Sequence, residues 1–197
     1  MVGVLLILCL YCASDCNLFE FVIYAAVQLM GMSSHGLHWF ENCYTKESIS
    51  YQVKHWGINV FRAAMYIGEG GYASRPELKQ KVKDIVQWCK DLGVYVMIDW
   101  HVLTPGNPSA STYSGAEAFF EEMATLYKDE SHVMYEIANE PNNVDWPTVK
   151  AYHDRIIPKI RAIDPETIII AGTTTWSQDI HLAAANPVAM PVSLKTG

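Results

Sequence analysis

The sequence predicts an α/β fold, an incomplete (β/α)8 or TIM barrel with about five of the eight βα units present. From residue 27 onward, short apolar or β-branched runs alternate with amphipathic helical patterns, which is typical of parallel βαβ units. Successive runs begin about 31 to 39 residues apart, so eight units would total roughly the 250 residues of a complete barrel. We therefore expect a partial barrel over residues 27–197.

Five apolar runs are predicted to be strands. They occupy residues 27–32, 58–64, 94–100, 133–138 and 167–172. No convincing sixth run follows, so the first and fifth strands would keep unpaired edges, and exposed edges of buried parallel strands favour aggregation. From this count of units we expect a truncated or partial gene product.

Residues typical of helix ends lie between the runs. Ser74 and Glu77 form a capping-box pattern, after which apolar residues recur with a period of about 3.6 until Gly93. Ser114 and Glu117 form the same pattern before a second helix that extends to residue 127. We expect both serines to cap their helices.

The third predicted helix has an N-cap candidate in Asp145, and Pro147 suits its first turn, where a missing N–H costs little. Pro158 lies inside this helix and is expected to kink it, because proline removes one backbone donor. A short fourth helix is expected after Ser177.

The charge of the chain excludes two classes of partner. There are 14 Lys and Arg against 21 Asp and Glu, which gives a net charge of -7. This charge repels the phosphates of nucleic acids and the anionic surface of membranes, so neither is an expected partner. Neutral ligands such as sugars remain compatible with it.

The N-terminal residues resemble a secretory signal. Residues 1–13 form a short apolar run, followed by Ser14 and Asp15. The run is shorter than the roughly 20 apolar residues that span a membrane. We expect a signal over residues 1–14 and an extracellular protein; a buried strand or helix is the alternative interpretation.

The five cysteines show no metal-binding spacing. Cys9 and Cys12 would leave with a cleaved signal. Cys89 falls on the apolar face of a predicted helix, so we favour buried thiols over a bridge between Cys16 and Cys43.

Polar side chains follow several runs at their carboxyl ends, where barrel enzymes place their working residues. The second run carries Arg62 and Tyr66, and the third ends with Asp99 and His101. An inward guanidinium is costly unless a carboxylate pairs with it. We expect Glu136, or a carboxylate outside this sequence, to pair with Arg62.

The fourth run and the residues after it read VMYEIANEPN, residues 133–142. A carboxylate beside an amide at a strand end suits glycoside hydrolysis, in which an acid protonates the leaving oxygen while a neighbour holds the sugar's 2-hydroxyl. This run resembles, at every position, the signature of glycoside hydrolase family 5, the cellulase family. GMSSHGLHWF, NVFRAAMY, VMIDWH and GTTTWSQD are also similar to segments of its bacterial-type endoglucanases.

The resemblance implies a role for each matching residue. Glu140 would be the acid/base catalyst and Asn139 would bind the 2-hydroxyl at the cleaved sugar, while Arg62 and His101 would support the catalytic centre. The alternatives are a solvated carboxylate at Glu140, a structural ion pair at Arg62 and a structural histidine at His101.

Four side chains would line sugar subsites by the same resemblance: His35, Trp39, Tyr66 and Trp176. Flat apolar rings suit the C–H face of a pyranose. Packing is the alternative for each of them, and nearly as well supported for Tyr66. The remaining tryptophans are assigned to packing: Trp56, Trp88, Trp100 and Trp146.

The family also has parts that this sequence lacks: a His-x-Tyr pair after strand six, the nucleophilic Glu after strand seven and a Trp after strand eight. Glu136 cannot replace the nucleophile, because it lies about 13 Å below Glu140 along a strand, too far for the retaining geometry. Asp99 also lies below the rim. Residues 15–26 are unlike the family's usual lead-in to the first strand.

We therefore expect a hydrolase of internal β-1,4-glucosidic bonds in cellulose or a related β-glucan, acting by retaining double displacement, with its nucleophile missing from this chain. The chain alone is expected to show little or no turnover. Two alternatives remain: a noncatalytic carbohydrate-binding remnant or inactive fragment, and a mannanase or xylanase of the same family. The expected partner is a polysaccharide, bound by a monomer that has no cofactor and no metal site.

Overall fold

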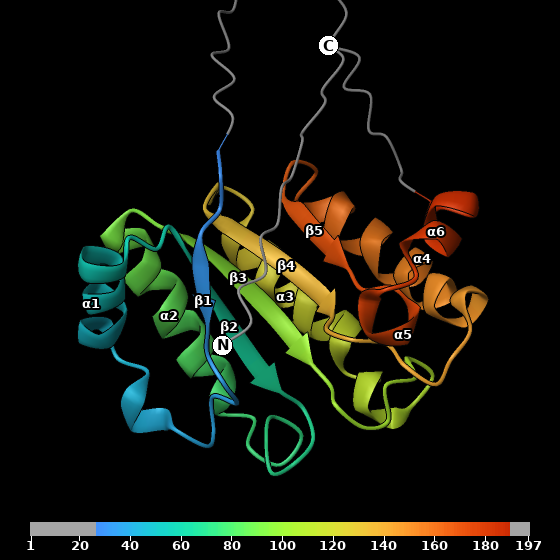
Figure 1. Cartoon of the computed structure of the whole chain (residues 1–197), viewed down its shortest axis with the longest axis horizontal. Coiled ribbons are helices and arrows are strands. Elements are labelled where there is room, and N and C mark those ends of the chain that lie inside the picture. The colour runs from blue at the N-terminus through green and yellow to red at the C-terminus, as the bar shows by residue number, and fades with distance from the viewer. Residues whose placement is uncertain (1–26, 190–197) are drawn as a thin grey trace, which may run out of the picture.

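The computed structural model describes residues 27–189. They form one parallel sheet with the strand order β1-β2-β3-β4-β5, and helices connect successive strands. The strands lie side by side in chain order, with helices α2, α3 and α4 behind them (Figure 1). The predicted α/β fold with five βα units is confirmed.

Each predicted strand is present. The strands are β1 (Gly31–Ser33), β2 (Val60–Tyr66), β3 (Tyr95–His101), β4 (Val133–Ala138) and β5 (Ile168–Ala171). Strand β4 has the predicted bounds, whereas β1 is shorter than predicted because its ladder with β2 begins only at Gly31. Within residues 27–189, β1 and β5 each pair along one edge, so this part of the barrel is open.

Between residues 27 and 189, six α-helices and two short 3-10 helices accompany the strands. They are α1 (Lys46–Trp56), α2 (Leu78–Leu92), α3 (Ala116–Tyr127), α4 (Trp146–Ile163), α5 (Thr174–Ser177) and α6 (Ile180–Ala185), with 3-10 turns at Glu41–Cys43 and Ser111–Tyr113. Helix α1 was not predicted, because Ile49 is its one buried residue and the helix therefore lacks a repeated apolar pattern. Helix α6 is the short helix expected after Ser177.

Only one of the three predicted N-caps is correct. The Asp145 side chain accepts a hydrogen bond from the Thr148 backbone N–H at the start of α4, as predicted, and the helix continues past Pro158. The two capping boxes are wrong. Ser74 lies in a series of turns and α2 starts after Glu77 without a side-chain cap, while the Ser114 hydroxyl donates to the Ser111 carbonyl oxygen.

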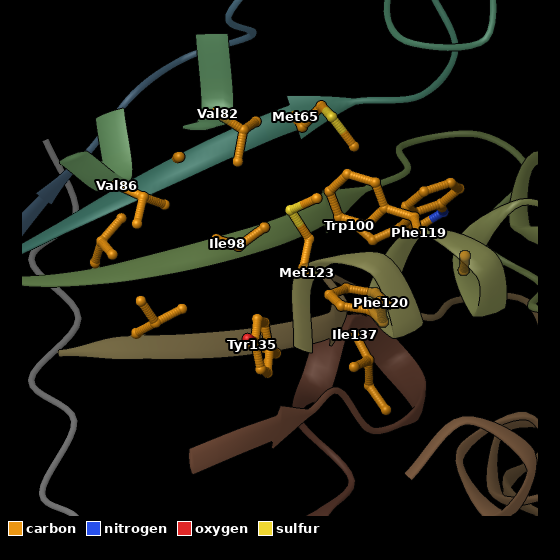
Figure 2. Packing of buried hydrophobic residues seen from close by; sticks show 14 of the residues in the cluster. Met65, Val82, Val86, Ile98, Trp100, Phe119, Phe120, Met123, Tyr135 and Ile137 are labelled. Carbon is orange, nitrogen blue, oxygen red and sulfur yellow. The ribbon is translucent and has the colours of Figure 1, made fainter. Parts of the chain in front are cut away.

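The hydrophobic core lies between the sheet and its helices. Alternate side chains of β2, β3 and β4 point into it, as do apolar residues of α2 and α3 (Figure 2). Among the strand residues are Met65, Ile98, Trp100 and Tyr135, each at most 1% exposed. Because side chains alternate along a strand, the residues between these point to the opposite face of the sheet.

Some expectations concern residues outside the described range. The secretory signal over residues 1–14, the lead-in over 15–26 and Cys16 all lie there. Cys89 is buried as predicted, and burial raises the pKa of its thiol to about 12; Cys43 is exposed. None of the helices within residues 27–189 is both long and apolar enough to cross a bilayer.

Candidate active site

Strand register brings the polar residues together on the sheet face opposite the helices. Ala64 of β2 is aligned with Asp99 of β3, and Asp99 is aligned with Glu136 of β4. Two residues nearer the carboxyl end, Tyr66 is aligned with His101. Two rows of functional side chains therefore cross the sheet, separated by one pleat repeat.

Arg62 lies two residues before Ala64 on β2, and its guanidinium contacts the carboxylates of the lower row. Its Nε and Nη2 atoms donate to the two carboxylate oxygens of Glu136 at 2.6 and 3.0 Å, and Nη2 also lies 2.9 Å from Asp99 Oδ2. Nη1 donates to the Ser33 hydroxyl at 3.2 Å. The predicted pairing of Arg62 with Glu136 is confirmed, and Asp99 is a second anion beside the same guanidinium.

Burial, Asp99 and Arg62 act in opposing directions on the pKa of Glu136. Burial and the negative charge of Asp99 raise the pKa of Glu136, and the contacts with Arg62 oppose that rise. Burial alone would lower the pKa of Arg62, but Asp99 and Glu136 together raise it above its ordinary value. The guanidinium therefore stays charged, while Glu136 holds a proton more readily than an exposed glutamate.

Asn139 connects Arg62 to His101. Its Oδ1 accepts a hydrogen bond from Arg62 Nη2 at 2.6 Å, and its Nδ2 lies 3.2 Å from His101 Nε2. His101 Nδ1 in turn lies 2.6 Å from Asp99 Oδ2. Asn139, His101 and Asp99 are all buried. The Asn139 amide is therefore held at its oxygen and at its nitrogen by bonds that are shielded from water.

Glu140 differs from its neighbours because it is exposed. It follows Asn139 directly at the carboxyl end of β4, and its backbone oxygen accepts a hydrogen bond from Asn142 Nδ2. The turn packs tightly against the end of β5: a Cβ added to Gly172 would lie 2.5 Å from the Ala138 carbonyl oxygen. The carboxylate of Glu140 therefore projects to solvent from a backbone that β5 fixes.

Three of the four predicted subsite residues form one aromatic cluster with His101. The Tyr66 ring stacks on the His101 ring, with centroids 4.0 Å apart and planes 12° from parallel. Trp39 lies 4.9 Å from Tyr66 and 4.8 Å from His35 between ring centroids. This cluster thus adjoins the Arg62 network through a single histidine.

Trp176 is not part of that cluster in the described structure. It lies in α5 after β5, is 52% exposed and has a positive φ of 54°. Its backbone N–H donates to the Pro141 carbonyl oxygen, so it borders the Glu140 turn from the other side. Of the tryptophans assigned to packing, Trp100 and Trp146 are buried, but Trp56 is 58% exposed at the end of α1 and that assignment is wrong.

Sequence reasoning gave Asp99 no role and did not anticipate His38 beside the aromatic cluster. His38 lies 4.9 Å from Trp39 between ring centroids, and its Nε2 bonds the Glu69 carbonyl oxygen. Within residues 27–189 no group of three His, Cys, Asp or Glu side chains is arranged to hold a metal ion. A hollow of about 500 Å³ lies apart from these residues, between Tyr113, Glu117 and Arg155.

The sequence of this chain matches known proteins. Residues 20–196 match the model of the cellulase family, glycosyl hydrolase family 5. Endoglucanase A of Evansella cellulosilytica is 51% identical over 168 residues, covering 84% of this chain and 34% of that protein. An endoglucanase of Clostridium saccharobutylicum is 53% identical over 166 residues, covering 82% of this chain and 37% of that protein.

Solved structures of the same family are similar to this fold. The catalytic domain of Thermobifida fusca endoglucanase Cel5A superposes with a TM-score of 0.79 at 40% identity, covering 83% of this chain and 56% of that one. A variant of that domain was solved in complex with cellotetraose. The chain spans about a third of the length of these curated relatives. On the family match and the shared barrel geometry, this chain belongs to glycosyl hydrolase family 5, the cellulases.

Proposed function

We propose that this chain carries the acid/base side of a retaining endo-β-1,4-glucanase centre. Glu140 protonates the glycosidic oxygen and later activates the attacking water, and Asn139 holds the sugar's 2-hydroxyl. Arg62 and His101 fix Asn139. A second carboxylate forms the covalent glycosyl intermediate.

The position of Glu140 is the observation that carries the proposal. It is an exposed carboxylate beside a buried amide whose two polar atoms are both engaged. An acid catalyst has to reach the bridging oxygen, whereas the residue gripping the sugar has to be rigid. The pair Asn139 and Glu140 meets these two opposite requirements.

The nucleophile is proposed to lie on sequence outside this chain. Asp99 is completely buried and Glu136 is 9% exposed, and both are engaged with Arg62. A carboxylate held in this way is a poor nucleophile toward a sugar carbon. We therefore assign the role of nucleophile to neither Asp99 nor Glu136.

The aromatic cluster and the relatives support a β-glucan as the substrate. His35 and Trp39 are exposed beside Tyr66, which is itself buried against His101, and exposed flat rings suit the C–H side of pyranose rings. The named relatives are endoglucanases, and one solved relative binds cellotetraose. We propose that Trp176 contacts the sugar chain on the other side of Glu140.

A completed barrel tests the proposal. Residues 27–189 are fused to the C-terminal half of the Evansella relative, and hydrolysis of carboxymethyl-cellulose is measured. Glu140→Gln is expected to lower kcat by at least about 100-fold, the range for loss of a general acid. Glu69→Gln, on an exposed loop after β2, is the matched control and should retain activity. Equal activity of the two variants would remove Glu140 from the mechanism.

The 197-residue chain by itself is expected to show little or no hydrolysis. Robust turnover by the purified chain would refute a nucleophile supplied from outside it. If the completed barrel releases reducing sugars from β-mannan or xylan and not from β-glucan, the backbone that is cleaved would be reassigned.

A carbohydrate-binding role without catalysis is the second candidate, because the aromatic cluster lies within residues 27–189 while the proposed nucleophile does not. Affinity electrophoresis on soluble β-glucan distinguishes the two. Retardation of the chain without hydrolysis by the completed barrel would favour binding alone. If the chain is not retarded and the completed barrel does not hydrolyse β-glucan, the chain is an inactive fragment.

We also propose that the protein is secreted, since a polymeric glucan is too large to enter a cell and residues 1–13 are apolar. N-terminal sequencing of protein recovered from the medium checks this. A chain that starts near residue 15 is expected; a chain found only inside cells and starting at Met1 would refute secretion.

A further inference from the structure

We propose that Asp99 is a positioning residue: acting through His101, it fixes the side-chain amide of Asn139 in one orientation. The proposal deepens the proposed function and rests on it for its consequence, because that amide is the group assigned to the sugar's 2-hydroxyl. The hydrogen-bond pattern itself is independent of any activity.

The orientation of the amide follows first from Arg62. A guanidinium has only donors, and its Nη2 lies 2.6 Å from one polar atom of the Asn139 side chain, which must therefore be the oxygen. The amide nitrogen then faces His101 Nε2 at 3.2 Å. Since the amide nitrogen donates, Nε2 has to accept, and the proton of the neutral ring lies on Nδ1.

The same tautomer follows from Asp99. His101 Nδ1 lies 2.6 Å from Asp99 Oδ2, and an ionised carboxylate only accepts. Asp99 is 0% exposed, so bulk water does not compete for this bond. From Asp99 through His101 and Asn139 to Arg62, each contact therefore joins one donor to one acceptor.

Asp99 acts on His101 by hydrogen bonding and on Arg62 mainly by charge. Arg62 Nη2 is 2.9 Å from Asp99 Oδ2, but its two hydrogens are directed to Glu136 Oε1 and Asn139 Oδ1. The other oxygen, Oδ1, is buried and has no hydrogen-bond partner among the described residues. One carboxylate oxygen therefore serves both neighbours, and it is the acceptor that His101 needs.

Two other histidines of the described residues, His153 and His38, carry a proton on the opposite ring nitrogen. His153 Nε2 lies 2.8 Å from the Gly172 carbonyl oxygen, and His38 Nε2 lies 2.9 Å from the Glu69 carbonyl oxygen. Because a carbonyl oxygen only accepts, both rings carry a proton on Nε2. The ring signals of these two histidines therefore serve as internal references for the Nε2–H form.

Loss of the acceptor at position 99 has a specific consequence. Without it, His101 is free to take the Nε2–H form, which would direct a donor at the Asn139 amide nitrogen and break that contact. In Asp99→Asn the amide oxygen is expected to take the place of Oδ2, because the Nδ1 donor of His101 and the positive charge of Arg62 face that place. The amide nitrogen is then expected to take the place of the unpartnered Oδ1. The asparagine variant keeps the acceptor and removes the charge, whereas Asp99→Ala removes both.

Two-bond proton–nitrogen correlation spectra of the isotope-labelled 197-residue chain test the proposal. His101→Gln assigns the ring signals of His101. The unmodified chain and Asp99→Asn are expected to show His101 protonated on Nδ1, and Asp99→Ala to shift it to the Nε2–H form. Hydrogen exchange of the Asn139 side-chain amide is expected to be slow in the first two chains and fast in the third.

An Nε2–H tautomer in the unmodified chain overturns the proposal, and this result requires no variant to fold. If Asp99→Asn shifts the His101 tautomer as Asp99→Ala does, the charge of Asp99 and not its acceptor oxygen determines the tautomer. This result also refutes the proposal. An unchanged tautomer in a folded Asp99→Ala chain does the same. Failure of the proposed function would appear in the hydrolysis assay and leave these spectra unchanged.

Discussion

Arg62 and Glu136 form a bidentate ion pair, with Arg62 Nε 2.6 Å from Glu136 Oε2 and Nη2 3.0 Å from Oε1. The residues lie on β2 and β4, and the strand between them contributes Asp99 to the same guanidinium. A planar guanidinium matches a carboxylate in this way, whereas a lysine would not. The pair therefore fixes three strands at the level of the site.

Replacing Arg62 with Met is expected to lower the free energy of unfolding by about 3 to 5 kcal/mol, since it leaves buried carboxylates without a partner. Urea denaturation of the chain measures this. Arg75→Met is the matched control, because Arg75 pairs with Glu41 and Glu77 at the surface, and its loss should be far smaller. Similar midpoints for the two variants would mean that the Arg62 network contributes little.

Trp39→Ala is expected to weaken binding to soluble β-glucan about 3- to 10-fold, the effect of losing one aromatic contact. Affinity electrophoresis gives the dissociation constant. Trp56→Ala is the control, because Trp56 is also exposed but ends α1 before β2 begins, away from the carboxyl ends of the strands. An equal effect of the two substitutions would argue against sugar stacking at Trp39.

Gly172→Ala is expected to destabilise the end of β5 by about 1 to 3 kcal/mol, the usual cost of overpacking. The added Cβ would lie 2.5 Å from the Ala138 carbonyl oxygen and 2.9 Å from Pro141 Cδ, so the turn that carries Glu140 must shift. Thermal unfolding measures the cost. In Gly68→Ala the added Cβ meets nothing within 4 Å, and this variant should unfold like the unmodified chain.

Acid is expected to destabilise the fold through His153. Burial lowers the pKa of His153 to about 4, although its bond to the Gly172 carbonyl oxygen opposes this. Between about pH 6.5 and 4 the unfolded chain therefore binds a proton that the folded chain does not, and up to about 3 kcal/mol of stability is lost as the pH falls through this window.

Urea denaturation at a series of pH values measures that slope. His153→Gln removes the titrating ring and should flatten the slope between pH 6.5 and 4, while His55→Gln on the exposed side of α1 should leave it unchanged. A slope that His153→Gln leaves intact would assign the acid sensitivity to other groups.

The sequence by itself determined the five βα units, the bounds of β4, the pairing of Arg62 with a carboxylate and the family. These features depend on local periodicity and on a contiguous motif, which a single chain displays in order. Helix α1 escaped prediction because Ile49 is its one fully buried residue, so its sequence shows no extended apolar face. The two serine caps failed because turns before the helices use the same residue types.

Only the tertiary structure decided the role of Asp99 and the separation of Trp176 from the aromatic cluster. Asp99 contacts His101 two positions away and Arg62 on another strand, and that choice depends on the register of β2 against β3. Register is a property of paired strands, so no run of adjacent residues contains it. For the same reason, the contiguous motif was enough to propose Glu140 as the proton donor, whereas the contacts that hold its neighbour Asn139 became visible only in the folded sheet.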